Sequence, residues 1–235
     1  HAINNRKLPA IVGEIFIWIG FVLTTGTLVS RGISAGHMPL SNTYETLMFL
    51  SWLIPLCYLF LRKQDTQRLM GMGITLFNVF IICGSALVND VPRPLVPALH
   101  SNWLTIHVLF MFLSYSTFSI SFITAILYLI FKNKKTIDFD KLTYQLILFG
   151  FPFLTLGIFT GAVWANRAWG TYWSWDPKET WSLITWLIYA VYLHTRRLKG
   201  WKGNRCAWLA LLAFAMVIFT YFGVNYLLPG LHSYK

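Results

Sequence analysis

Charged side chains are scarce in this chain, and acidic ones are the scarcest. Only 11% of its 235 residues are charged, with eight Asp and Glu against nineteen Lys and Arg. Soluble domains carry about a quarter charged residues, so the composition excludes an ordinary water-soluble domain. With 56% apolar residues, we expect a polytopic membrane protein instead.

Cysteine is almost as rare. The three cysteines, Cys57, Cys83 and Cys206, are scattered, with no CxxC pair and no metal-ligand spacing. This excludes a disulfide framework or a zinc site of the usual patterns. Each lies in or beside an apolar run, so we expect small packing residues.

Long apolar runs, in contrast, are abundant. A membrane-spanning helix needs about 20 predominantly apolar residues. Seven runs approach or exceed this length: approximately 9–30, 43–61, 69–89, 103–131, 142–164, 179–195 and 205–228. We therefore predict an all-α, polytopic transmembrane helix bundle of about seven spans, built as a single integral membrane domain over residues 1–235.

The net charge of +11 would favour a nucleic-acid partner in a soluble domain, but here we interpret it as topology and expect no nucleic acid. With the N-terminus inside, the inner segments hold fourteen Lys and Arg and the outer segments five. The positive-inside rule supports this orientation. It places the Trp-rich segment 165–180, the loop 36–42 and the C-terminal tail outside, on the outer face of a bacterial inner membrane or in a thylakoid lumen.

Residues 169–181 read WGTYWSWDPKETW and contain four Trp and one Tyr. A hydrophobic core would leave the acids unpaired. A membrane-interface belt explains Trp and Tyr by solvation alone, whereas this density of indoles around Asp-Pro-Lys-Glu favours a platform for a flat ligand. For Asp176 two roles stay open: it orients an indole N–H, or it caps the sixth helix ahead of Pro177.

This segment resembles the tryptophan-rich WWD signature of the haem-handling membrane proteins of cytochrome c maturation. The continuation through Trp186 to 192–196 (YLHTR), the stretch 36–42 (GHMPLSN), 101–107 and the tail 223–234 are similar to the CcsA (ResC) family. That family is the membrane subunit of the system II cytochrome c synthase. The resemblance runs from about His37 to the C-terminus.

The resemblance implies that haem b is the substrate, carried to the outer face and joined to the CxxCH motif of apocytochrome c through two thioether bonds. A CcsB/ResB-type partner, separate or fused, would complete this haem lyase, and thiol-reducing proteins would act indirectly. No catalytic residue is assigned beyond haem positioning. Two alternatives stay open: a haem channel or chaperone that only presents haem, and a solute transporter whose Trp-rich loop is structural.

The resemblance also implies site residues. His107 and His232 would ligate one outer haem iron, with His100 as a weaker competitor. The haem surround would comprise Trp169, Trp173, Trp175, Asp176, Lys178 and Trp181, with Lys178 and Arg167 as the cations for the propionates. His37 would be structural or part of this surround.

His194 lies 13 residues beyond Trp181, which is about 20 Å along one helix. One iron cannot serve both places. The resemblance implies a second, inner haem position with His194 as one ligand and the partner supplying the other. Two acids keep open roles: Glu45 caps the second helix or belongs to the outer site, and Glu14 is functional or snorkels to the interface.

Overall fold

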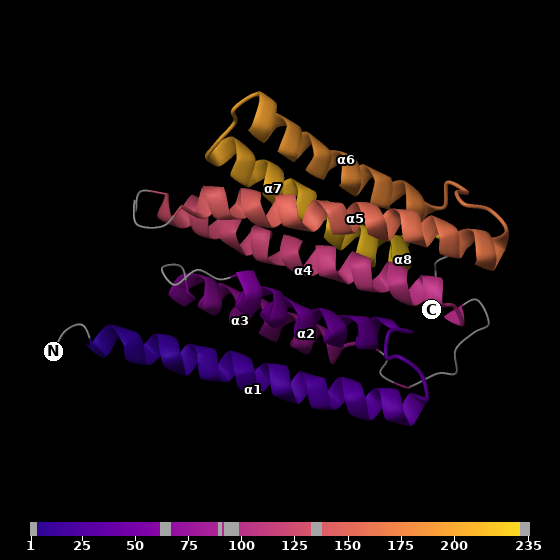
Figure 1. Cartoon of the computed structure of the whole chain (residues 1–235), viewed down its shortest axis with the longest axis horizontal. Helices are drawn as coiled ribbons and strands as arrows, with labels where there is room; N and C mark the ends of the chain where they lie inside the picture. Colours follow the sequence, from indigo (N-terminus) through magenta and orange to yellow (C-terminus); the bar gives the residue numbers. More distant parts are fainter. Residues whose placement is uncertain (1–3, 62–66, 89–90, 92–98, 133–137, 231–235) are drawn as a thin grey trace. The chain divides into compact units, whose positions relative to one another are not determined.

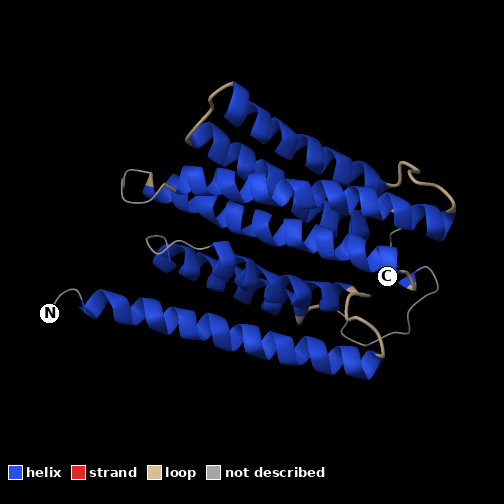
Figure 2. Cartoon of the chain, in the orientation of Figure 1, coloured by secondary structure: helices blue, strands red, loops and turns tan. Residues whose placement is uncertain are grey.

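The computed structural model describes residues 4–61, 67–88, 91, 99–132 and 138–230. This part of the chain is helical and contains no strand (Figure 2). The predicted all-α class is therefore confirmed.

The helices follow the predicted apolar runs closely (Figure 1). In chain order they are α1 Asn4–Ala35, α2 Thr43–Leu61, α3 Gln67–Ser85, α4 Asn102–Phe131, α5 Phe139–Trp169, α6 Pro177–Leu198 and α7 Asn204–Ile218, which continues through a π-helix, η3 Phe219–Gly223, into α8 Val224–Leu227. Among the described residues, five stretches can cross a membrane by length and composition, namely Gly13–Ala35, Thr43–Phe60, Asn102–Phe131, Phe139–Trp169 and Asn204–Leu227. The polytopic membrane architecture is confirmed, while spans through α3 and α6 stay predictions.

The helices form two compact units, His1–Leu95 and Val96–Lys235. α1, α2 and α3 pack together in the first unit, and α4 to α8 pack together in the second. The prediction of a single domain over residues 1–235 stays a prediction. All of the predicted iron ligands and aromatic platform residues that the structure describes belong to the second unit.

A buried ion pair closes the turn between α1 and α2 in the first unit. Glu45 is fully buried, and its Oε1 accepts a hydrogen bond from Arg31 Nε at 2.9 Å. Its Oε2 accepts from the backbone N–H and the hydroxyl of Ser41 at 2.8 and 2.7 Å. A buried carboxylate needs such partners. Of the two roles left open for Glu45, the structure shows the local one, in which it holds the start of α2.

Three glycines of α5 allow α4 to approach closely in the second unit. A Cβ at Gly157 would lie 2.5 Å from Met111 Sδ, a Cβ at Gly161 would lie 2.6 Å from His107 Nδ1, and a Cβ at Gly150 would clash with Thr117. No side chain larger than hydrogen fits such distances without a shift of the neighbour. These glycines therefore set the depth at which α4, and with it His107, packs on α5.

Candidate functional site

His107 is held by the backbone of the neighbouring helix. Its Nδ1 lies 2.7 Å from the carbonyl oxygen of Gly157. A carbonyl can only accept, so Nδ1 carries the proton and the ring lone pair is on Nε2. The second ring nitrogen of a metal-binding histidine is usually anchored in this way, so the contact is compatible with the predicted ligand role of His107.

A row of aromatic rings connects His107 to the Trp-rich segment. The His107 ring lies nearly parallel to the ring of Trp164, with centroids 6.4 Å apart and planes at 10°. Trp164, which is 2% exposed, meets Trp169 edge-on at 4.7 Å. The first indole of the motif is thus one ring away from His107.

The loop between α5 and α6 exposes Trp175 and leaves Trp173 half-buried. Gly170 ends α5 in the left-handed region (φ 81°), and its N–H donates to the Asn166 carbonyl. Trp175 also has a positive φ, 59°, which a bulky residue adopts only when its surroundings impose it. Its side chain is 68% exposed and meets Trp173 edge-on at 5.7 Å. A strained and exposed indole beside a half-buried one is more typical of a binding surface than of a core.

The Asp-Pro-Lys-Glu sequence builds the start of α6. Asp176 and Glu179 form a reciprocal capping box, with Pro177 at the first helical turn, as these residue types favour. Glu179 Oε2 also accepts the Ser174 N–H at 2.7 Å. Of the two roles left open for Asp176, the structure shows the helix cap. Glu179 in turn holds the loop that presents Trp173 and Trp175.

The two cations predicted to meet propionates both have protein partners. Lys178 Nζ donates to Asn225 Oδ1 at 2.7 Å, and the Arg167 guanidinium lies 5.6 Å from the centre of the Trp103 ring. Burial lowers the pKa of Lys178 to about 8, with Asp176 partly opposing this shift. Lys178 and Asn225 tie α6 to the C-terminal segment.

Trp181 faces the C-terminal segment. Its ring lies 4.3 Å from that of Phe219 in η3, and its carbonyl accepts a weak hydrogen bond from Thr220 at 3.3 Å. The predicted ligand His232 lies outside the described residues. Gly230, two positions earlier, packs against the cap of α6, because a Cβ there would lie 2.5 Å from Asp176 Oδ1.

The remaining histidines differ sharply from His107. His194 is exposed on α6, and within the described parts of the chain it forms no hydrogen bond or ion pair. His100 is also exposed. His37 belongs to the first unit, where its Nδ1 lies 2.9 Å from the Met38 carbonyl oxygen.

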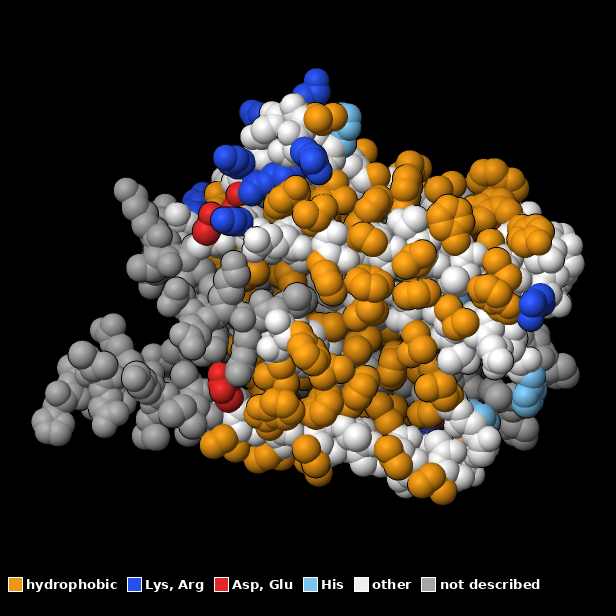
Figure 3. Space-filling view, viewed as in Figure 1, with side chains coloured by type: hydrophobic (Ala, Val, Ile, Leu, Met, Phe, Trp, Pro, Cys, Tyr) orange, Lys and Arg blue, Asp and Glu red, His pale blue; other side chains and the backbone are white. Residues whose placement is uncertain are grey.

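The α6–α7 turn beside His194 is rigidly built. Arg196 pairs with Asp140 at 2.7 Å and donates to the Trp201 carbonyl at 3.2 Å. Asp140 also accepts the Gly203 N–H at 3.0 Å. Figure 3 shows Lys and Arg gathered at this end of α6, next to a surface of apolar side chains. Several of these cations, Arg197, Lys199, Lys202 and Arg205, are exposed.

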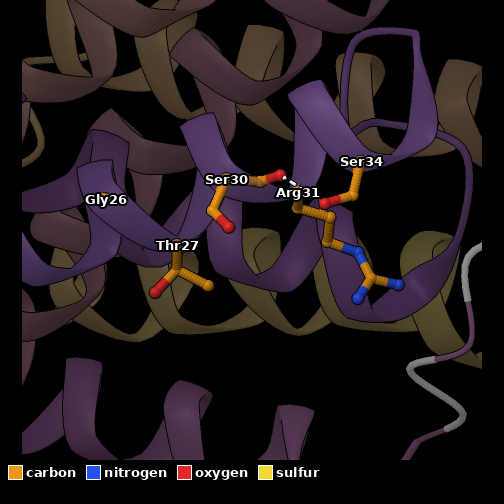
Figure 4. A pocket seen from close by; sticks show the side chains of 5 residues that line it. All are labelled: Gly26, Thr27, Ser30, Arg31 and Ser34. Carbon is orange, nitrogen blue, oxygen red and sulfur yellow. Dashed lines mark hydrogen bonds between the residues drawn. The ribbon is translucent and has the colours of Figure 1, made fainter.

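Other features of the described residues do not form a competing site. No group of three His, Cys, Asp or Glu within them is arranged to hold a metal ion. A hollow in the first unit is lined by Gly26, Thr27, Ser30, Arg31 and Ser34, all on α1 (Figure 4). It contains none of the predicted ligands, and Arg31 is engaged by Glu45.

Sequence reasoning missed several residues that shape the site, namely Trp164, Gly157, Gly161, Glu179, Asn225 and Gly230. Trp164 stood five residues before the motif without any pattern marking it. The D-x-x-E spacing of Asp176 and Glu179 was the one signal that could have shown the capping box in full.

Comparison with known proteins identifies the family. The family described as "Cytochrome C assembly protein" matches residues 40–232. The cytochrome c biogenesis protein CcsA of Chlamydomonas reinhardtii is 46% identical over 98% of the chain and 70% of its own length. CcsA of Guillardia theta is 46% identical over 91% of the chain and 82% of its length, and CcsA of Marchantia polymorpha 40% over 98% and 89%. The chain belongs to the CcsA family.

Membership in the CcsA family agrees with the helical architecture of the second unit and with the predicted family resemblance. Among solved structures, the cytochrome c haem lyase CcmF superimposes with a TM-score of 0.63 at 19% identity. The match covers 91% of this chain but 39% of CcmF. At this identity the likeness shows a common fold and nothing finer.

Proposed function

We propose that this CcsA-family chain acts in cytochrome c biogenesis by binding haem b as a substrate and presenting it for covalent attachment to apocytochrome c. The observation that carries the proposal is His107, whose ring is oriented by the Gly157 carbonyl and stacked on Trp164. A neutral imidazole with its lone pair on Nε2 is the form that binds haem iron.

The outer haem is proposed to lie between His107 and His232, against the indoles of Trp169, Trp173 and Trp175. Exposed aromatic faces are suited to the flat macrocycle. Asp176 and Lys178 contribute at the start of α6, where they fix the capping box and the contact with Asn225. Trp181 completes this surround beside Phe219.

The inner haem is proposed to bind His194, with its second ligand from a CcsB/ResB-type partner. A histidine on a membrane helix is costly unless it meets a partner or a ligand. Exposed apolar residues, Leu187, Val191 and Leu198, lie on α6 near His194. The exposed cations that follow on the α6–α7 turn suit haem propionates.

Haem supplies two vinyl groups, each of which can accept a cysteine thiol of the CxxCH motif. In each addition a C–S bond forms, the vinyl C=C π bond is consumed, and the thiol hydrogen ends on the other vinyl carbon, with no net change in electrons. This chain would contribute by orienting the haem vinyl groups toward the cysteine thiols, because correct positioning of two reactants accounts for a large part of many catalytic rate enhancements. A chain that only presents haem differs from a lyase subunit in yielding no covalent product.

The test is to purify the chain with its partner and to record absorption spectra of wild type, His107→Ala, His232→Ala and His194→Ala. His100→Ala is the matched control, because His100 is an exposed histidine in the same segment as His107. We expect the two outer variants to lose six-coordinate haem, His194→Ala to lower haem loading, and the control to behave as wild type.

A second measurement asks whether the same complex makes covalent cytochrome c from apocytochrome c and haem. A covalent product supports a role in attachment, whereas haem binding without a product supports presentation only. A wild-type complex that carries no haem would contradict both roles. Haem bound normally by His107→Ala would contradict the assignment of the outer site.

A further inference from the structure

The C-terminal segment, from Phe219 to Gly230, is tied to the first half of α6 at three successive points. The first is the π-helix η3, where the Thr220 hydroxyl lies 3.0 Å from the Thr185 hydroxyl and Phe219 packs on Trp181. The second is the hydrogen bond from Lys178 Nζ to Asn225. The third is the contact of Gly230 with Asp176.

The second and third contacts are unusually specific. Lys178 is half-buried, and a hydrogen bond from a charged donor is stronger than one between neutral groups. At Gly230 a Cβ would lie 2.5 Å from Asp176 Oδ1 and 3.1 Å from Pro177 Cδ. Asp176 cannot retreat easily, because it also caps α6. Only glycine lets the chain pass over this cap.

His232 follows two residues after Gly230, and two residues of extended chain reach at most about 7 Å. The Gly230–Asp176 contact thus determines where the ligand-bearing tail leaves the described structure. Asp176 and Lys178 belong to the same motif as Trp173 and Trp175, so one short segment carries these indoles and also contacts Asn225 and Gly230.

We propose that Asp176, Lys178, Asn225 and Gly230 form a latch that positions the C-terminal tail for haem ligation by His232. Asn225 and Gly230 are positioning residues, which act through His232 and not on the haem itself. This inference rests on the proposed outer haem site. In this proposal Asp176 and Lys178 of the Trp-rich motif help to orient His232, the second axial ligand.

The experiment uses the chain with its partner in a Cys83→Ala background, because Cys83 is an exposed cysteine. Spin labels at Thr171 and Leu227, both exposed, report the distance between the Trp-rich loop and α8 in haem-depleted protein. Haem-loaded samples report axial ligation by absorption and electron paramagnetic resonance. The variants are Asn225→Leu and Gly230→Ala. The controls are Asn225→Asp, which keeps an acceptor for Lys178, and Gly84→Ala, where a Cβ meets no atom within 4 Å.

We expect Asn225→Leu to broaden the distance distribution. Both Asn225→Leu and Gly230→Ala should weaken haem retention about tenfold, as loss of one charge-assisted hydrogen bond or its equivalent predicts. Six-coordinate haem should return when imidazole is added. Asn225→Asp and Gly84→Ala should match wild type.

Unchanged distances in Asn225→Leu together with unchanged retention in Gly230→Ala would overturn the latch. A broadened distribution with wild-type axial ligation would also overturn it, because the tail would then need no positioning. If wild type itself binds no haem, the proposed outer site fails separately, and the distances measured without haem still decide whether Asn225 fixes α8.

Discussion

His107 and His194 lie on helices of the same unit, yet their burial and their contacts differ. His107 is half-buried, anchored by a carbonyl of α5 and stacked on Trp164. His194 is exposed, and the described residues give it no polar contact. One histidine is preorganised by its own chain, whereas the other is available to a ligand or to another subunit. The comparison supports the proposal that this fold sets the outer haem position, and that the inner position takes a ligand from another subunit.

Replacing His107 and His194 by glycine in turn should give the largest difference between the two positions, measured as rescue of haem binding by added imidazole. His107→Gly leaves a space enclosed by Gly157, Gly161 and Trp164, so added imidazole should bind there and restore outer haem ligation. Loss of a supporting contact around a bound metal already costs about 10–100-fold, so loss of the ligand should exceed this. Haem spectra titrated with imidazole measure the effect.

His194→Gly is the counterpart. Its side chain is exposed, so we expect no enclosed space and weaker rescue at the same imidazole concentration. Equal rescue of both variants would break the distinction between the two histidines.

Filling the space beside His107 should have the next largest effect. In Gly161→Ala the new methyl would lie 2.6 Å from His107 Nδ1, so the ring must move away from the Gly157 carbonyl. Overpacking of this kind costs about 1–3 kcal/mol. We expect lower thermal stability and a changed haem spectrum. Gly20→Ala, where a Cβ meets nothing within 4 Å, should change neither, and a normal haem spectrum in Gly161→Ala would show that the Gly157 contact is dispensable.

Changes at the end of α6 that carries His194 should affect the stability of the fold rather than haem ligation at the proposed outer site. Asp140→Ala leaves Arg196 without its carboxylate and the Gly203 N–H without an acceptor. The pair is mostly buried, with side chains 9% and 16% exposed, so we expect a loss of about 1–3 kcal/mol. Chemical denaturation in detergent measures it, with Arg197→Ala as the exposed control. Loss of outer haem in Asp140→Ala would show that the two ends are coupled.

The smallest expected effect is the pH dependence of folding stability that comes from Lys178. Its pKa falls from 10.5 to about 8 in the folded chain, so between these values the unfolded state holds the proton and the folded state does not. Stability should therefore rise with pH across this window. Lys178→Met should lose that slope, which denaturation at several pH values would reveal. A wild-type slope of opposite sign would mean that Asp176 and Asn225 stabilise the ammonium group by more than its burial costs.

The sequence predicted the helices well because each spanning run is long, apolar and bounded by charges or turn residues. It also marked the Trp-rich segment, since four indoles among acids have few structural explanations. It did not show the geometry around His107, because nothing in a linear pattern tells which α5 residue a ring on α4 will meet. The alternative roles of Asp176 and Glu45 were decided by local hydrogen bonds, which depend on loop conformations that residue types leave open.

The π-helix η3 has a consequence for the phase of the last helix. Its bond from the Val224 N–H to the Phe219 carbonyl spans five residues, which is the signature of one residue inserted into an α-helix. One residue corresponds to about 100° of rotation. If one residue of η3 were deleted and the segment returned to regular α-helix, Asn225 and all that follows would turn by that angle, away from Lys178. Among lineages of this family, a single-codon deletion here would therefore be expected to disturb the outer site more than most substitutions on the same helix.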